Sequence, residues 1–428
     1  MSILIESGEA PRPKAAAASL SKLVGPGLIV AATGIGAGDI VSATVGGARF
    51  GESLAWCIVL GAAFKYLLNE GVARIQLATG LTALESWARF LPWWVRAYFG
   101  AYLVVWTVAV SAALANACGL GIATLTGGFI PQSWGSVFHA LAGAALVLLG
   151  GFSGFEKMMK VLIGMMFFSV VVCAALLFED APGLLRGLLL PGFAGGGAAY
   201  VLSLVGGIGG TVTLLSYNYW LREEKMVEPE YVGYVRRDLA LGYGFTAAFG
   251  ISVLMIASRA FHDAGIPITD AEAVPRMGEM LATLVGPVGF YVYAFGFWAA
   301  VFAALFGVWQ SVPYIYADFY AIWKGAGPEE RERLTRVTSV PYRIALAYVA
   351  LTPIPLAFLG RPLFIIVTYT IVGSCFLPFL AATLLWLDRK INWPAKVPRN
   401  GRLGNALLLL LLAVFALVGF REIVTALS

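Results

Sequence analysis

The sequence predicts an all-α membrane protein with eleven transmembrane helices, arranged as two inverted repeats of five helices plus one further helix. Of its 428 residues, 60% are hydrophobic and only 12% are charged, whereas about a quarter of the residues in soluble domains are charged. Apolar runs of about 20 residues, each long enough to cross a membrane, recur along the chain. The first and sixth runs also share a glycine motif, which suggests a repeat.

The eleven apolar runs define the expected domain organisation. A polar tail, residues 1–22, precedes a first repeat at 23–180, a second repeat at 196–387 and an additional helix within 404–428. The expected spans are residues 23–48, 53–78, 98–128, 137–153, 158–178, 197–221, 238–258, 284–320, 343–359, 363–387 and 404–420.

The distribution of Lys and Arg predicts the orientation in the membrane. Of the 29 Lys and Arg residues, 21 lie in the N-terminal tail or in connections on the same side, and six lie on the opposite side. Positive residues collect in cytoplasmic loops, so we expect an inner-membrane protein with a cytoplasmic N-terminus and an external C-terminus. This loop bias accounts for the net charge of +5, and no nucleic-acid partner is implied.

The glycine motif lies in the middle of two predicted spans. Residues 33–39 read TGIGAGD in the first span, and residues 206–213 read GGIGGTVT in the sixth. The second segment comes five spans after the first. Because each repeat then contains an odd number of spans, the two halves have inverted orientations in the membrane. Paired, glycine-interrupted helices at such positions are typical of secondary transporters that bind substrate near the bilayer midplane. The alternative is that these glycines only allow close helix packing.

Short segments along the chain resemble the Nramp family of proton-coupled divalent metal transporters. This resemblance implies the inverted-repeat fold of the amino-acid transporter LeuT, with spans one and six unwound. The segments that carry it are Gly25-Pro26-Gly27, residues 46–51, Arg74, Thr79-Gly80, Phe155-Glu156-Lys157, residues 209–212 and Leu377-Pro378-Phe379.

The family's metal-binding motifs are altered in this chain. The Asp-Pro-Gly-Asn signature of span one falls on residues 36–39, GAGD, and the Met-Pro-His of span six falls on residues 213–215, TLL. The acidic pair of span three falls on Ala113 and Asn116, and a span-ten glutamine falls on Thr370. Loss of the thioether leaves oxygen donors, which favour hard cations. The chain therefore resembles the Nramp-related magnesium transporters, and we expect Mg²⁺ ahead of Mn²⁺ as substrate.

The expected ligands of such a cation lie in the two interrupted spans. Asp39 is the expected anion, with the backbone carbonyls of Gly36 and Gly210 and the hydroxyl of Thr213 as neutral donors. Further candidate substrate-binding residues are Thr211, Thr370 and Gln310. Gln310 is equally compatible with helix packing.

Lys65 leaves a second function open. It lies near the middle of span two, and a cation there is costly unless it faces protein or water and has a partner. If Lys65 reaches Asp39, its ammonium replaces a metal electrostatically, which favours a small organic solute such as an amino acid. A non-transporting sensor on the same scaffold is the third possibility.

Motifs for catalysis are missing from the chain. Neither glycine run is followed by the Lys-Ser/Thr of a phosphate-binding loop, and no zinc-protease or serine-hydrolase signature occurs. We therefore expect no enzymatic activity and no resident cofactor. The expected partners are a metal ion or small solute and the lipid bilayer, and the sequence sets no oligomeric state.

Overall fold

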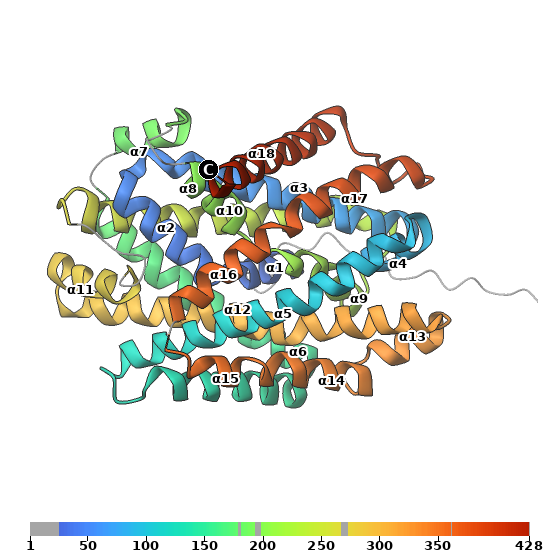
Figure 1. The fold of residues 1–428 in the computed structure, drawn as a ribbon, viewed down its shortest axis with the longest axis horizontal. Helices are drawn as coiled ribbons and strands as arrows, with labels where there is room; N and C mark the ends of the chain where they lie inside the picture. The colour runs from blue at the N-terminus through green and yellow to red at the C-terminus, as the bar shows by residue number, and fades with distance from the viewer. Residues whose placement is uncertain (1–24, 179–180, 193–197, 267–272, 361, 428) are drawn as a thin grey trace, which may run out of the picture.

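The computed structural model describes residues 25–427 except 179–180, 193–197, 267–272 and 361. Every regular element in these residues is helical, and Figure 1 shows the helices packed into one bundle. Seven helical stretches of the described part are long and apolar enough to cross a membrane. The predicted all-α membrane fold is confirmed, while the predicted tail, residues 1–22, lies outside the described residues.

The first half of the chain contains spans one to five. Predicted spans four and five form one long element, α6, which the non-helical Gly151 (φ 56°, ψ −171°) divides. The short helices α4 and α7 were not predicted. The elements are α1 (Pro26–Gly34), α2 (Ala37–Phe50), η2 (Gly51–Leu54), α3 (Ala55–Thr79), α4 (Ala83–Phe90), α5 (Trp93–Leu125), α6 (Gln132–Leu176) and α7 (Ala181–Leu189).

The second half contains spans six to eleven. Here the short helices α11 and α13 lie outside the predicted spans. The elements are α8 (Ala198–Gly207), η3 (Val212–Leu215), α9 (Ser216–Glu223), η4 (Pro229–Tyr231), α10 (Val232–Ala257), η5 (Ser258–His262), α11 (Ala273–Val285), α12 (Pro287–Lys324), α13 (Pro328–Thr335), α14 (Val340–Leu351), α15 (Pro353–Ala357), α16 (Pro362–Ser374), α17 (Phe376–Lys390) and α18 (Arg402–Leu427).

Span one is broken between α1 and α2. Pro26 starts α1, where its missing N–H costs no helical hydrogen bond. The helix ends at Gly34, because Ile35 (ψ 89°) and Gly36 (ψ −170°) leave helical geometry before α2 begins at Ala37. The sequence prediction of an unwound first span is therefore confirmed.

Span six is broken between α8 and η3. Gly209 and Gly210 follow the end of α8 with φ values of 85° and 84°, a conformation that favours glycine because it has no Cβ. A single 3₁₀ turn, η3, then leads directly into α9. The predicted unwinding of span six is also confirmed.

The broken spans lie inside the bundle. α1 contacts α10 and α12, and α2 contacts α10 and α8. Figure 1 shows the short α1 surrounded by longer helices. Because hydrocarbon cannot satisfy free backbone groups, such breaks require a protein-lined position like this one.

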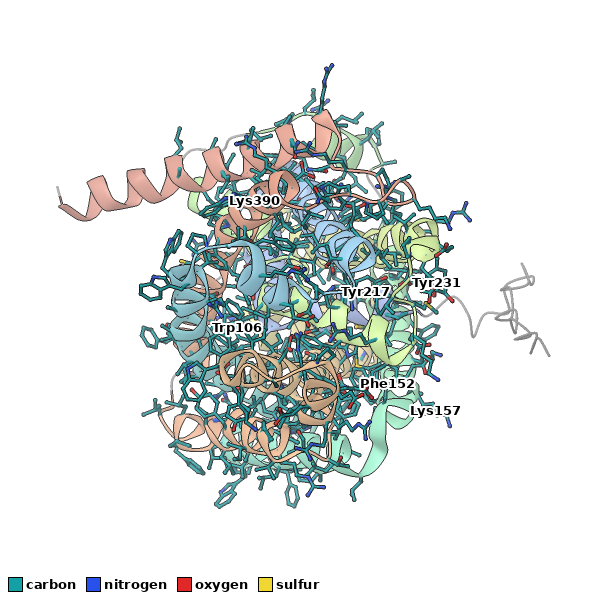
Figure 2. The ribbon with its side chains drawn as sticks, turned by 90° about the vertical axis from the view of Figure 1, so that its right-hand side faces the viewer. Trp106, Phe152, Lys157, Tyr217, Tyr231 and Lys390 are labelled. Carbon is teal, nitrogen blue, oxygen red and sulfur yellow. The ribbon has the colours of Figure 1, made fainter. Side chains whose placement is uncertain are left out.

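A buried carboxylate anchors the start of α1. Asp238 on α10 accepts a hydrogen bond from the Gly27 N–H at 2.6 Å and another from the Tyr217 hydroxyl at 2.9 Å. Figure 2 labels Tyr217, which lies among the helices, whereas Lys157 and Tyr231 lie toward the periphery of this end view. Asp238 therefore links α1, α9 and α10.

A second cluster of charged side chains ties together the end of the bundle where α4, α9 and α13 lie (Figure 1). Arg331 on α13 contacts both Glu85 and Asp318. Glu85 also pairs with Arg222 at 2.8 Å, and Asp318 accepts from the Tyr219 hydroxyl at 2.7 Å. This end cluster joins α4, α9, α12 and α13.

We expect Asp238→Ala to destabilise the protein. The substitution leaves the Gly27 N–H and the Tyr217 hydroxyl buried without their acceptor, which costs about 1–3 kcal/mol per unsatisfied group. Thermal unfolding in detergent measures the effect. The control is Asp263→Ala, which removes an exposed carboxylate paired with Arg259 and changes stability by less than about 1 kcal/mol. Equal melting temperatures for the two variants would contradict the proposed anchor.

Candidate functional site

The two helix breaks meet each other. A Cβ atom added to Gly34, at the end of α1, would lie 2.4 Å from the carbonyl carbon of Gly209 and 2.6 Å from the amide nitrogen of Gly210. Both atoms belong to the backbone, so no side chain can rotate away to make room. Only glycine at position 34 permits this approach, and the contact places both interruptions in one site.

Asp39 bridges the two breaks. Its Oδ2 accepts from the Gly36 N–H at 2.7 Å, and its Oδ1 accepts from the Gly209 N–H at 3.0 Å. The side chain lies in the first turn of α2, where the helix dipole favours a negative charge. Only 8% of Asp39 is exposed. One carboxylate therefore satisfies an amide from each interrupted span.

Lys65 donates hydrogen bonds to backbone carbonyls of the same site. Its Nζ donates to the Gly206 carbonyl oxygen at 3.0 Å and also to that of Gly210. The residue is completely buried, and its charge attracts that of Asp39. Asp39 and Lys65 are both described, yet they form no direct ion pair within 4 Å. The ammonium instead binds the carbonyls that the break in span six releases.

The remaining predicted site residues divide into two groups. Near the break, the buried Thr213 hydroxyl has no hydrogen-bond partner among the described residues, and that of Thr211 accepts from Trp106 Nε1 at 3.0 Å. The Thr370 methyl would lie 2.7 Å from a Cβ on Gly38, and its hydroxyl donates to a carbonyl of its own helix. Gln310 instead accepts from Trp220 Nε1 at 2.6 Å.

Sequence reasoning missed several residues that support the site. Trp106 binds Thr211, and the Tyr243 ring would lie 3.1 Å from a Cβ on Gly209. Both aromatic residues occur within apolar runs, where the sequence distinguishes them in no way from packing residues. Asp238 could have been recognised from the sequence as a residue that needs a buried partner, since it is a carboxylate at the beginning of predicted span seven.

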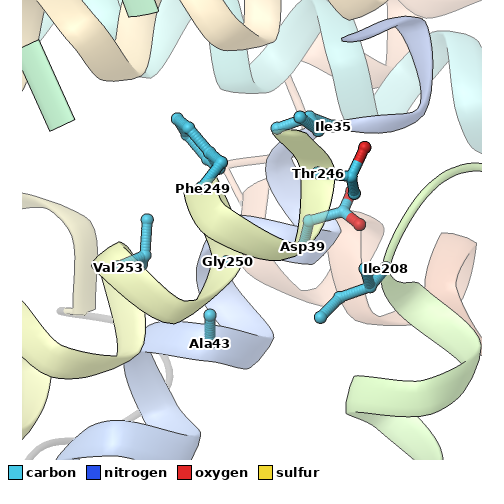
Figure 3. A pocket seen from close by; sticks show the side chains of 8 residues that line it. All are labelled: Ile35, Asp39, Ala43, Ile208, Thr246, Phe249, Gly250 and Val253. Atoms are coloured by element: carbon cyan, nitrogen blue, oxygen red, sulfur yellow. The ribbon is translucent and has the colours of Figure 1, made fainter. Parts of the chain in front are cut away.

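The space beside Asp39 is small. A cavity of about 10 Å³ is lined by Asp39 and by seven residues, which belong to α2, to α10 and to the breaks that follow α1 and α8. Figure 3 shows these residues around the cavity, with Thr246 beside Asp39 and with Phe249, Gly250 and Val253 further along α10. A volume of this size holds about one water molecule.

Side-chain metal ligands are sparse. Across the described ranges, no group of three or more His, Cys, Asp or Glu side chains is positioned to hold a metal ion. Thr246 lines the cavity beside Asp39, and the Thr213 hydroxyl lies against Gly210 in the break of span six. A cation at this site would therefore depend on one carboxylate together with neutral oxygen donors.

Two broken helices that meet inside an all-helical membrane bundle define the LeuT-type class of fold. The structure resembles that of a manganese transporter of Eremococcus coleocola, with a TM-score of 0.70, 15% identity and coverage of 97% of this chain and 88% of the other. It also resembles MhsT, solved in complex with L-phenylalanine, with a TM-score of 0.59, 15% identity and coverage of 92% and 97%. At these identities the similarity establishes the fold.

Residues 27–425 match the profile of the natural resistance-associated macrophage protein-like (Nramp) family, and the chain belongs to this family. One relative is the divalent metal cation transporter MntH of Chromohalobacter salexigens, 27% identical over 63% of this chain and 64% of the relative. The MntH of Deinococcus radiodurans is 26% identical over 63% of each. These two alignments therefore span less than two thirds of either relative's length.

We expect Gly34→Ala to separate the two breaks and lower the stability of the protein. The new methyl group meets the backbone of Gly209 and Gly210, and such overpacking costs about 1–3 kcal/mol. The control is Gly164→Ala on α6, where a Cβ meets nothing within 4 Å and helix propensity improves. Thermal unfolding of both variants measures the difference. If Gly34→Ala is as stable as the control, the close contact between the breaks is wrong.

Proposed function

We propose that this protein is a secondary transporter that moves a divalent cation, Mg²⁺ ahead of Mn²⁺, by alternating access. The observation that supports it is Asp39, a buried carboxylate held between two broken helices. Membership of the Nramp family and the names of the MntH relatives agree with a divalent metal substrate. The oxygen-only donors favour the harder cation.

The proposed ligands are Asp39, the carbonyls of Gly36 and Gly210, and the Thr213 hydroxyl. Thr213 supports this proposal because its buried oxygen has no partner among the described residues. Thr211 and Thr370 border the site as lesser contributors, and Gln310 is bound to Trp220 of α9. Magnesium keeps several water molecules and needs few protein ligands, so one carboxylate is sufficient for it.

Transport requires the site to open to each side in turn. The small cavity and the end cluster around Arg331 describe a closed conformation. We propose that residues 23–180 and 196–387 act as the two moving repeats, with residues 404–428 outside them. In this proposal the N-terminus is cytoplasmic, the C-terminus is external, and the end with α4 and α13 faces the cytoplasm, as the Lys and Arg distribution indicates.

A small organic solute is the second candidate substrate. The observation in its favour is the Lys65 ammonium of α3, which lies against the broken sixth span and can bind a carboxylate. Together, Asp39 and Lys65 give the site one negative and one positive charge, which suits a zwitterion. MhsT, which shares the fold, was solved with L-phenylalanine.

Calorimetry separates these candidates. We expect the purified protein to bind MgCl₂ more tightly than MnCl₂, and we expect Asp39→Asn to weaken binding by about tenfold or more because a 2+ ion loses its anion. Asp263→Asn is the matched control, since this exposed carboxylate lies outside the site. Absence of heat with Mg²⁺, Mn²⁺ and Ca²⁺, or identical isotherms for Asp39→Asn, would overturn the cation proposal.

Flux assays complete the test. We expect Mg²⁺ or Mn²⁺ uptake into proteoliposomes that contain the protein. Thermal stabilisation by an amino acid, without any metal binding, would favour the organic solute. Metal binding without flux would instead favour a non-transporting sensor.

A further inference from the structure

The Lys65 ammonium occupies the position where a bound cation would contact the broken sixth span. Its Nζ reaches the carbonyl oxygens of Gly206, in the last turn of α8, and of Gly210, in the break that follows. The Gly206 carbonyl belongs to the negative end of the helix dipole, and in hydrocarbon both carbonyls need a donor or a cation. The Lys65 ammonium, on the neighbouring helix α3, is both a hydrogen-bond donor and a cation.

The packing around Lys65 holds its side chain at this break. A Cβ added to Gly209 would lie 3.2 Å from Lys65 Cγ and 3.5 Å from Lys65 Cβ. One turn earlier on α3, a Cβ on Gly61 would lie 3.1 Å from Val205 Cα. These contacts keep α3 against α8, so the ammonium is directed at the Gly206 and Gly210 carbonyls.

Lys65 and the proposed substrate require the same oxygen. The Gly210 carbonyl is a proposed ligand of the transported cation, and Lys65 donates to it. An ammonium and a divalent cation on one carbonyl would repel strongly at this short separation inside protein. The Thr213 hydroxyl, which lies against Gly210 without a partner among the described residues, is an additional oxygen that Lys65 does not use.

We propose that Lys65 is a tethered cation that fills the carbonyl half of the site when substrate is absent, so that Lys65 and the transported cation exclude one another. This inference rests on the proposed function. In the empty transporter, Lys65 then satisfies the carbonyls of the broken span. The site can therefore close without any bound ion. The substrate enters by displacing an internal positive charge, and this charge returns to the carbonyls after release.

Two neutral variants of Lys65 test the proposal. Lys65→Gln keeps an N–H donor for the carbonyls and removes the charge, and Lys65→Met removes both. We expect Lys65→Gln to bind MnCl₂ and MgCl₂ about tenfold or more tightly than the unaltered protein, because the competing charge is gone. Lys65→Arg retains a positive charge, so we expect it to bind both metals with the affinity of the unaltered protein. The control is Lys157→Gln, which makes the same change on an exposed residue and leaves the affinity unchanged.

Thermal unfolding provides a second measurement on the same proteins. Without metal, we expect Lys65→Met to melt below Lys65→Gln, since its carbonyls lose their donor. Saturating MnCl₂ then raises the melting temperature of Lys65→Gln by more than that of the unaltered protein, because tighter binding stabilises more.

The outcomes separate the inference from the proposed function. Tighter metal binding by Lys65→Gln than by the unaltered protein supports the inference. Equal binding by the variant and the unaltered protein overturns the inference and leaves cation transport standing. Weaker binding by Lys65→Gln also overturns it, because Lys65 would then assist the substrate. If the unaltered protein and every Lys65 variant bind no metal, both the inference and the proposed function fail.

Discussion

The structure depends on one constraint, which is that unpaired backbone groups are not tolerated inside a membrane. Both interrupted spans release such groups, and two charged side chains receive them. Asp39 accepts from the amides of Gly36 and Gly209, while Lys65 donates to the carbonyls of Gly206 and Gly210. The carboxylate therefore pairs with backbone amides, and the ammonium pairs with backbone carbonyls. This division lets two helices remain broken inside the bundle, because side chains of the same chain satisfy backbone groups that the breaks release.

The same division determines what a substrate must do. Any ligand that enters the site replaces contacts that are already satisfied, so it contributes binding free energy only to the extent that its own contacts are better. A ligand shifts the conformation by its difference in affinity between two states. The cavity beside Asp39 holds about one water molecule. Entry of a larger ligand there would require a change at Asp39, at Lys65, or at both, and would link binding to rearrangement of the broken helices.

The sequence predicted the two breaks because closely spaced glycines weaken a helix and recur here at related places in two apolar spans. The carboxylate of Asp39 strengthened that interpretation. Lys65 was also singled out, since a charge at mid-membrane needs a partner. Its partner was not predictable, because the long side chain reaches either Asp39 or the carbonyls from the same position. The pairing of Trp106 with Thr211 was hidden for a different reason. Contacts between helices far apart in the chain leave no periodic signal in an apolar run.

The second half of span six is held by three consecutive residues that reach three different helices. Tyr217 donates to Asp238 on α10, Asn218 donates to Gln76 on α3 at 2.7 Å, and Tyr219 donates to Asp318 on α12. On a helix, consecutive side chains point about 100° apart, so α9 is fixed on three sides. A movement of α9 away from any one helix strains its contacts with the other two. Asp238 also holds the start of α1, so the two interrupted spans share an anchor. Opening at this end is therefore expected to release α1 and α9 together, as a switch between two packed arrangements rather than a gradual displacement.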